Sequence, residues 1–239
     1  MKDVGDGLEI ENASWRFRGD VVAKFDEHVS KSVPFYLEGH ELICRVSDWF
    51  VKDDSRVYDL GCSTGSLLAK LARRAAKKEN VSFVGVDAEA EMIDRARDRI
   101  QADGLDNVSF LVDDITQVPL EPCDLVTSYY TIQFVRPSVR QQLIDRIYQS
   151  LQWGGAFVLF EKVRGNDARF QDILTGLYTD YKLDQGYSAD EIVAKSRSLK
   201  GVLEPFSSQG NIDLLRRAGF ADVTSIFKYI CFEGFLAIK

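Results

Sequence analysis

Apolar and polar positions along the middle of this 239-residue chain alternate between strand-like and helix-like patterns. Residues 57–60 combine β-branched and bulky side chains as buried strands do, and residues 66–76 then repeat leucine and alanine at helical spacing. Further strands are predicted at 81–87, 108–114, 123–129 and 156–161, and further helices at 90–102 and 138–151. This alternation predicts an α/β fold with a parallel sheet and right-handed crossovers.

Helical patterns precede and interrupt the predicted sheet. Residues 1–52 predict a helical cap that folds over a ligand cleft, with one helix ending at Pro34. Residues 164–205 form a helical, aromatic insertion after the fifth strand, expected above the carboxyl ends of the strands as a substrate lid or dimer contact. A helix at 211–220 and strands at 222–230 and 232–239 complete one predicted domain, 1–239. The apolar positions of the cap are Trp15, Phe17, Val21, Val22, Phe25, Val29, Leu42, Ile43, Val46 and Phe50.

The turn after the first of these strands narrows the choice of ligand. It reads GCSTG (61–65), without the middle glycine of the dinucleotide fingerprint and without the Lys-Ser/Thr pair of a P-loop. Asp59 precedes this turn, where a carboxylate suits an ammonium group, and Asp87 ends the next strand, where it can accept hydrogen bonds from both ribose hydroxyls. S-adenosyl-L-methionine has an ammonium group, a sulfonium and no phosphate, so the pattern predicts this cofactor. The alternative is an ordinary capped strand–turn–helix unit.

Other candidate residues lie at later strand ends and in the flanking helices. Asp114 is placed to accept from the adenine amino group with Ile115 against the ring face, whereas Asp113 fits a helix N-cap better. Tyr36 either lines the cleft or packs between two helices. In the insertion, the side chains most able to shape a pocket are Tyr178, Tyr181, Tyr187 and Arg197, although a helical aromatic stripe also fits plain packing.

The composition limits the partners. A formal net charge of −7 at pH 7 argues against an extended nucleic-acid surface. We expect no membrane association, because no apolar window approaches the length of a membrane span, and we expect a cytoplasmic location, because the N-terminus lacks a signal-peptide pattern.

Cysteine and histidine usage indicates no metal site. The four cysteines, at 44, 62, 123 and 231, lack C-x-x-C spacing and predict reduced thiols in the core. No motif surrounds His28 or His40, which favours packing or surface roles for both. A hydroxyl or amide acceptor would need a base, for which Glu161, Tyr129 and His28 are equally weak candidates. The catalytic residues therefore stay unassigned.

Several segments together resemble carboxy-S-adenosyl-L-methionine synthase and its class I methyltransferase relatives. They are WRFRGDVVAKFDEHVSKSVPFY (15–36), VYDLGCSTGSLLAKLA (57–72), Asp87-Ala88, TIQFV (131–135), GGAFVLFEK (154–162), and the stretch from GYSADEI (186–192) to LLRRAGF (214–220). The resemblance spans nearly the whole chain. It implies a class I methyltransferase (Rossmann-like) fold with a seven-stranded, mostly parallel sheet, and a homodimer. It also implies cofactor contacts at Tyr36, Gly61, Cys62, Ser63, Asp87, Ala88, Asp114 and Ile115.

Two positions differ from the pattern of the synthases. The synthases carry an Arg, in a KRS-type segment, that binds the extra carboxylate of the carboxylated cofactor. This chain has Ser196 at that position. The adjacent Arg197 points about 100° away around a helix. They carry an Asn at the end of the fourth strand, where this chain has Tyr129, which could fill the space of that carboxylate. An unpaired buried carboxylate costs on the order of several kcal/mol, so S-adenosyl-L-methionine is favoured over carboxy-S-adenosyl-L-methionine.

Three functions follow as hypotheses. The favoured one is a methyltransferase that acts on a small-molecule acceptor and converts S-adenosyl-L-methionine to S-adenosyl-L-homocysteine by in-line displacement. The second is a carboxy-S-adenosyl-L-methionine synthase that uses S-adenosyl-L-methionine and prephenate, in tRNA wobble-uridine modification. The third is a cofactor-binding partner subunit without chemistry of its own. The sequence does not indicate the acceptor.

Overall fold

The computed structural model describes residues 2–3, 9–10, 22 and 24–239. The expected cap positions Trp15, Phe17 and Val21 lie outside these residues. The central elements are β3 (Arg56–Leu60), α4 (Ser66–Arg74), β4 (Ser82–Asp87), α5 (Ala90–Asp103), β5 (Val108–Val112), β6 (Cys123–Tyr129), the 3-10 helix η1 (Ile132–Phe134), α6 (Pro137–Ser150) and β7 (Leu151–Lys162). They are followed by α7 (Ala168–Asp184), α8 (Ala189–Ser198), α9 (Ser208–Ala218), β8 (Asp222–Tyr229) and β9 (Phe232–Ile238). The N-terminal region contributes β1 (Lys2–Asp3), β2 (Glu9–Ile10), α2 (Phe25–Ser32) and α3 (Tyr36–Ser47).

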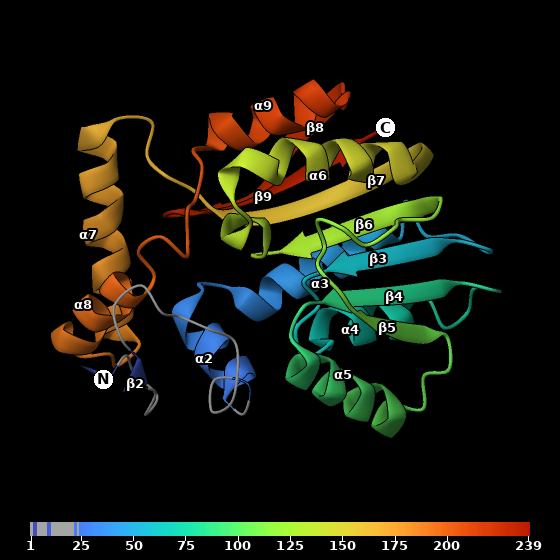
Figure 1. The fold of residues 1–239 in the computed structure, drawn as a ribbon, viewed down its shortest axis with the longest axis horizontal. Helices are drawn as coiled ribbons and strands as arrows, with labels where there is room; N and C mark the ends of the chain where they lie inside the picture. The colour runs from blue at the N-terminus through green and yellow to red at the C-terminus, as the bar shows by residue number, and fades with distance from the viewer. Residues whose placement is uncertain (1, 4–8, 11–21, 23) are drawn as a thin grey trace.

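Seven of the strands form one sheet in the order β5-β4-β3-β6-β7-β9-β8 (Figure 1). The first five of these pair in parallel, and β9 runs antiparallel to both of its neighbours. The predicted mostly parallel, seven-stranded sheet is confirmed. Strands β1 and β2 form a separate two-stranded sheet.

Helices cover both faces of the large sheet, which explains the nearly continuous apolar runs of its strands. On one face, Ile147 of α6 and Leu215 of α9 pack with Leu60 of β3. On the other face, Leu68 of α4 packs with Val57 of the same strand. Burying an aliphatic side chain of this size contributes roughly 1.5–3 kcal/mol, so the two cores fix the strand ends on which the site is built.

Strand β7 is longer than the sequence predicted. We expected a turn at Gly154–Gly155 to precede the strand, but β7 begins at Leu151 and runs through both glycines. Its pairing with β6 shifts register between Cys123 and Leu125, and Gly154 adopts a φ of +79°. A bulge with a glycine in the left-handed region absorbs an extra residue without ending the strand, which is why the turn signal was wrong here.

The insertion and the cap meet beyond one end of the sheet, where Figure 1 shows α7 and α8 beside α2. Tyr178 of α7 donates its hydroxyl hydrogen bond to the carbonyl oxygen of Ser32 in α2, at 2.8 Å. The hydroxyl of Tyr187 lies 3.2 Å from Oγ of the same serine. These contacts, one buried and one partly buried, join two segments that are far apart in the sequence.

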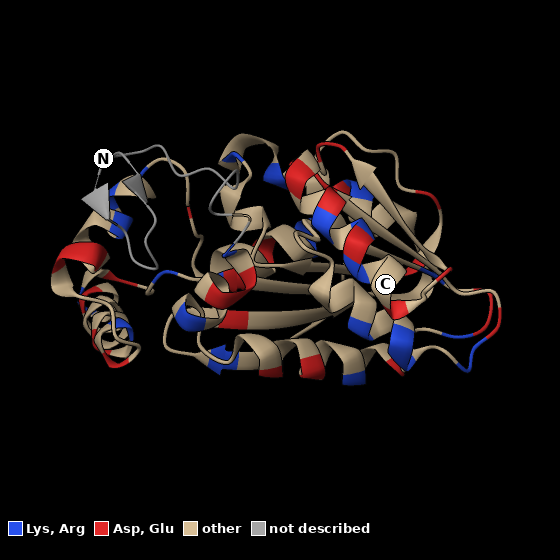
Figure 2. Ribbon diagram, turned by 90° about the horizontal axis from the view of Figure 1, so that it is seen from below, with Lys and Arg blue, Asp and Glu red and all other residues tan. Residues whose placement is uncertain are grey.

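The distribution of charged residues and the state of the cysteines are those expected from the sequence. Figure 2 shows acidic and basic positions interspersed along the helices. The four cysteines are free and buried, as predicted. None of the described helices is long and apolar enough to span a membrane.

Candidate active site

A cavity of about 1230 Å³ lies at the carboxyl ends of the parallel strands, with further walls from the cap and the insertion. Open α/β sheets bind their ligands in this position. The cavity brings together all ten residues that the sequence proposed for the cofactor. They are Tyr36, Asp59, Gly61, Cys62, Ser63, Asp87, Ala88, Asp114, Ile115 and Tyr129, and the proposed lid residues Tyr178 and Ser196 line it as well.

The glycine turn after β3 needs its glycines for space as well as conformation. Gly61 has a φ of +81°, and a Cβ atom there would lie 2.2 Å from Oγ1 of Thr131. The N–H groups of Gly61 and Cys62 both donate to the carbonyl oxygen of Val86, at 2.8 and 3.1 Å. The turn is therefore held against the end of β4, whose last residue is Asp87.

Asp87 is fixed from both sides by the backbone. Its Oδ2 accepts from the N–H of Ser63 at 2.9 Å, and its Oδ1 accepts from the N–H of Glu89 at 3.0 Å. Burial raises the pKa of this carboxyl, and the backbone hydrogen bonds oppose that rise. Each carboxylate oxygen has a second lone pair, so the group can still accept from two neighbouring hydroxyls.

Asp59 is more deeply buried, with 2% of its surface exposed. Thr127 of β6 donates its hydroxyl hydrogen bond to Oδ1 of Asp59 at 2.8 Å. Burial raises the pKa of Asp59 to about 7, the Thr127 hydrogen bond opposes the rise, and the Asp87 charge adds to it. A buried carboxylate of this kind is stabilised by a cationic ligand.

Asp114 and Ile115 lie at the rim of the same cavity. Oδ1 of Asp114 accepts from both the N–H and the hydroxyl of Thr116, each at 2.8 Å. Oδ2 of Asp114 accepts no hydrogen bond from the described residues. Ile115 is buried and presents an apolar surface beside it. Asp113 accepts from the N–H of Asp114 at 2.7 Å and does not line the cavity.

Three aromatic rings pack where the cap meets the end of β6. The centroid of Tyr129 lies 5.0 Å from Tyr36 and 4.8 Å from His40, and its hydroxyl donates to the carbonyl oxygen of Tyr36 at 2.7 Å. Tyr36 therefore lines the cleft and also packs against neighbouring elements. Burial lowers the pKa of His40 to about 3, so this imidazole is neutral at physiological pH.

Gly39 of α3 leaves room for the Tyr129 hydroxyl, since a Cβ there would lie 2.1 Å from that oxygen. We expect Gly39→Ala to lower the free energy of unfolding by about 1–3 kcal/mol, because overpacking outweighs the helix propensity of alanine. Adding Tyr129→Phe should recover part of the loss. Urea unfolding monitored by fluorescence measures both effects. Gly176→Ala in α7, where a Cβ meets nothing within 4 Å, is the matched control and should be neutral or stabilising.

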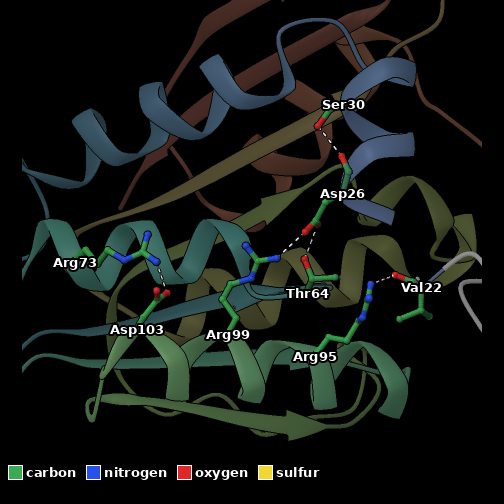
Figure 3. Close-up of polar contacts among 8 residues, drawn as sticks. All are labelled: Val22, Asp26, Ser30, Thr64, Arg73, Arg95, Arg99 and Asp103. Carbon is green, nitrogen blue, oxygen red and sulfur yellow. Dashed lines mark hydrogen bonds and ion pairs between the residues drawn. The ribbon is translucent and has the colours of Figure 1, made fainter. Parts of the chain in front are cut away.

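A polar contact ties the cap to the glycine turn (Figure 3). Asp26 of α2 accepts at Oδ1 from the hydroxyl of Thr64, at 2.7 Å, and at Oδ2 from Nη2 of Arg99 in α5, at 2.6 Å. Arg95, also in α5, donates to the carbonyl oxygen of Val22. Because Thr64 follows Ser63 in the turn, the position of α2 is coupled to the loop that holds Asp87.

Removing the Asp26 carboxylate should loosen the cap over the cofactor. We expect Asp26→Ala to weaken S-adenosyl-L-methionine binding by roughly 3- to 10-fold, mainly through faster dissociation, since this partly exposed pair is worth about 1 kcal/mol. Stopped-flow displacement measures the rate. Asp103→Asn, which breaks the Arg73–Asp103 pair between α4 and α5 in Figure 3, is the control. Equal dissociation rates for wild type and Asp26→Ala would contradict the coupling.

The structure does not bring every proposed residue into the cavity. Arg197 is exposed on α8 and does not line it, as the 100° rotation from Ser196 predicts. Tyr181 stacks on Tyr178 outside the lining, and Tyr187 packs against the cap. Glu161 lies behind the cavity wall, where burial raises its pKa to about 8 while Arg140 opposes that rise, so it is not placed to act as a base on a cavity ligand.

His28, which the sequence offered only as a weak candidate for a base, is buried in the cavity wall, with Nε2 2.9 Å from Nζ of Lys195. Sequence reasoning missed other residues of the site. Thr127 and Lys162 also line or support the site, and both lie near the carboxyl ends of strands. That position was the available signal for Lys162, whereas the lysine of α8 could be placed only by knowing how the insertion folds.

The residues present fit S-adenosyl-L-methionine. The buried Asp59 favours a cationic group, Asp87 offers two acceptor oxygens at the adjacent strand end, and the apolar Ile115 lies beside the partly unpaired acceptor Asp114. The donor set matches an ammonium group, a diol and an adenine ring. On the side of the cavity that runs from β3 to the end of β5, the charged lining residues among those described are acidic, which does not suit phosphates.

The fold and this site define a class I S-adenosyl-L-methionine-dependent methyltransferase domain. Residues 57–155 match the methyltransferase domain family. Among solved structures, a putative O-methyltransferase from Nostoc punctiforme superposes with a TM-score of 0.64 at 16% identity, over 92% of this chain and 60% of that one.

Longer sequence matches define the family more narrowly. The chain is 36% identical over 226 residues to the carboxy-S-adenosyl-L-methionine synthase of Staphylococcus epidermidis, covering 94% of this chain and 97% of that protein. It is 37% identical over 225 residues to the Campylobacter lari synthase, covering 94% of each. The chain belongs to the carboxy-S-adenosyl-L-methionine synthase family, and it is a S-adenosyl-L-methionine-dependent transferase, as predicted.

Proposed function

We propose that the protein transfers the methyl group of S-adenosyl-L-methionine to a small-molecule acceptor. One observation carries this proposal: the cavity is lined by Ser196 where the resemblance leads us to expect an arginine for a cofactor carboxylate. Tyr129, at the second differing position, has its hydroxyl bound to the Tyr36 carbonyl. Neither side chain supplies a cation to a carboxylated cofactor.

Each of the three lining carboxylates binds a different part of the cofactor. Asp87 accepts from the ribose hydroxyls, Asp59 balances the ammonium group, and Asp114 accepts from the adenine amino group. When bound, the cofactor supplies an electrophilic methyl group on its sulfonium. The aromatic side chains of the cap and the insertion exclude water and hold the acceptor close to that group, which supplies much of the rate enhancement of a displacement.

A second candidate function is favoured by the sequence matches. Relatives at 36–38% identity over nearly the whole chain bear the name carboxy-S-adenosyl-L-methionine synthase. On this proposal the protein forms the carboxylated cofactor from S-adenosyl-L-methionine and prephenate. Because position 196 is a serine, the cation that pairs with the new carboxylate would then come from another position.

Mass spectrometry of the ligand released from denatured, freshly purified protein separates the two functions. Methyl transfer predicts S-adenosyl-L-methionine or S-adenosyl-L-homocysteine, and no new product when prephenate is added to the enzyme with S-adenosyl-L-methionine. Carboxy-S-adenosyl-L-methionine in either experiment overturns the first proposal in favour of the second. Absence of any binding to S-adenosyl-L-methionine in a titration contradicts both.

We also propose that the protein is a cytoplasmic homodimer. Four free cysteines suit a reducing compartment. On α7, Phe170, Ile173 and Leu177 are about half exposed at i, i+3 and i+7, an apolar stripe that suits a second copy of the chain. Light scattering should give twice the monomer mass, and Leu177→Glu should shift it toward the monomer.

A further inference from the structure

The charged residues that line the cavity are sorted by sign. The four acidic ones, Asp59, Asp87, Glu89 and Asp114, belong to the strands and loops from β3 to β5. The six basic ones come from the segment that follows η1, from the end of β7 and from the insertion: Arg136, Lys162, Arg164, Lys182, Lys195 and Lys200. Within the described part of the chain, no Asp or Glu lines the cavity from those later segments. The cavity therefore has an acidic cofactor side and a basic second side.

Lys162 is the best defined cation of the basic side. It is the last residue of β7, and its Nζ lies 4.1 Å from the ring centroid of Tyr178 and 5.8 Å from that of Phe232. Burial lowers the pKa of this ammonium group, the neighbouring Cys231 opposes that change, and the charge of Lys200 adds to it. Lys200, which is exposed and also lines the cavity, thus adds a second positive charge near this partly buried ammonium group.

Neither cation is neutralised within the described residues, where no ion pair includes Lys162 or Lys200. Other lysines of the structure do have partners: Lys70 pairs with Glu41 at 2.6 Å, and Lys228 pairs with Glu233 at 3.0 Å. Bringing an ammonium group out of water is costly unless an anion accompanies it. A cavity that holds such a group beside aromatic rings is suited to a ligand that brings the negative charge.

We propose that Lys162, assisted by Lys200, binds a carboxylate of the acceptor. Leu174, Leu199 and Leu203, which line the cavity from the insertion, are apolar, so the acceptor class is a small carboxylic acid with an apolar body. This inference rests on the proposed methyl transfer, because it assigns the basic side of the cavity to the acceptor. Ser196 leaves that side without the arginine expected from the synthases, and Lys162 takes over the role of anion contact.

The test uses matched probes with the full-length protein saturated with S-adenosyl-L-homocysteine. Calorimetric titration with 3-phenylpropionate should show saturable binding, whereas the neutral 3-phenylpropionamide should bind at least about tenfold more weakly. Lys162→Gln should weaken the carboxylate by about tenfold or more and leave the amide and S-adenosyl-L-homocysteine unchanged. Lys162→Arg should retain carboxylate binding within a few-fold, and Lys200→Gln should cause a smaller loss. Lys77→Gln, an exposed lysine outside the cavity, is the charge-matched control.

Each other outcome overturns the proposal and is distinct from failure of the proposed function. No saturable binding of the carboxylate, or equal affinity for acid and amide, removes the anion subsite while cofactor binding persists. Tighter binding of inorganic phosphate than of the carboxylate would replace carboxylic acids with phosphates as the acceptor class. If Lys162→Gln weakens carboxy-S-adenosyl-L-methionine tenfold without affecting 3-phenylpropionate, the carboxylate belongs to the cofactor. Failure of wild type to bind S-adenosyl-L-homocysteine at all would instead contradict the proposed function.

Discussion

Replacing Asp87 with Asn is expected to weaken S-adenosyl-L-methionine binding by about 100-fold. Both carboxylate oxygens accept a backbone N–H, from Ser63 and from Glu89. An Asn side chain can accept on only one of these sides and turns its NH₂ group toward the N–H on the other. The variant therefore loses one anchor of the glycine turn as well as the charged acceptor for the ribose, together worth about 2–3 kcal/mol. Isothermal titration calorimetry measures the dissociation constant directly.

The neighbouring strand end offers a matched control. Asp113 follows β5 as Asp87 ends β4, but it is exposed and does not line the cavity. An Asn at 113 can still accept from the N–H of Asp114, so Asp113→Asn should bind the cofactor within about twofold of wild type. If Asp87→Asn also bound within threefold of wild type, the ribose contact would have to be assigned to another residue.

Site residues at strand ends, such as Asp87, could be predicted from the sequence more fully than those on the helices of the insertion. The order of strands and helices fixes which loops meet at one edge of a parallel sheet, because each crossover has the same hand. Asp59, Asp87 and Asp114 could be placed together from the sequence for this reason. Their chemistry depends only on the sheet, which the apolar pattern defines well.

The residues on the opposite wall depend on how non-adjacent helices pack, which periodicity does not encode. Tyr178 of α7 and Ser196 of α8 line the cavity, whereas Tyr181, one turn further along α7, does not. The contact of Asp26 with Arg99 joins residues 73 positions apart on two helix surfaces, where many charged pairs are equally compatible with the sequence. The lysines that line the basic side of the cavity from α7 and α8 could not be placed for the same reason, whereas the position of Lys162 at the end of β7 could be read from the sequence.

A second large effect is expected at Asp59, through the pH dependence of stability. Its pKa is about 7 in the folded protein against the ordinary 3.8, mainly because of burial. Between these two values the folded state keeps a proton that the unfolded state releases, so the free energy of unfolding falls as pH rises from about 4 to 7. The full loss is on the order of 4 kcal/mol. Asp59→Asn carries no such proton, so at pH 8 it should be more stable than wild type by an amount of this order, as measured by urea unfolding.

Glu161 provides the control that separates this effect from general burial. Its pKa is also raised, to about 8 from 4.5, and Glu161→Gln should likewise stabilise the protein at pH 8. Glu161 does not line the cavity, however, so Glu161→Gln should keep its affinity for S-adenosyl-L-methionine, whereas Asp59→Asn should lose at least about tenfold. If both variants are more stable at pH 8 but only Asp59→Asn loses affinity, the cost of burying the Asp59 charge serves cofactor binding.

The same linkage predicts that cofactor binding at pH 6 releases a proton. At that pH the free protein holds most of a proton on Asp59, and an ammonium group beside the carboxylate favours its ionised form. Calorimetric titrations in two buffers of different ionisation enthalpy should therefore report close to one proton released per cofactor by wild type and by Glu161→Gln, and none by Asp59→Asn. Release that persists in Asp59→Asn would locate the ammonium group elsewhere in the cavity. Release that vanishes at pH 8, where Asp59 is already ionised, ties the binding of this cation to the carboxylate that the sequence places before the glycine turn.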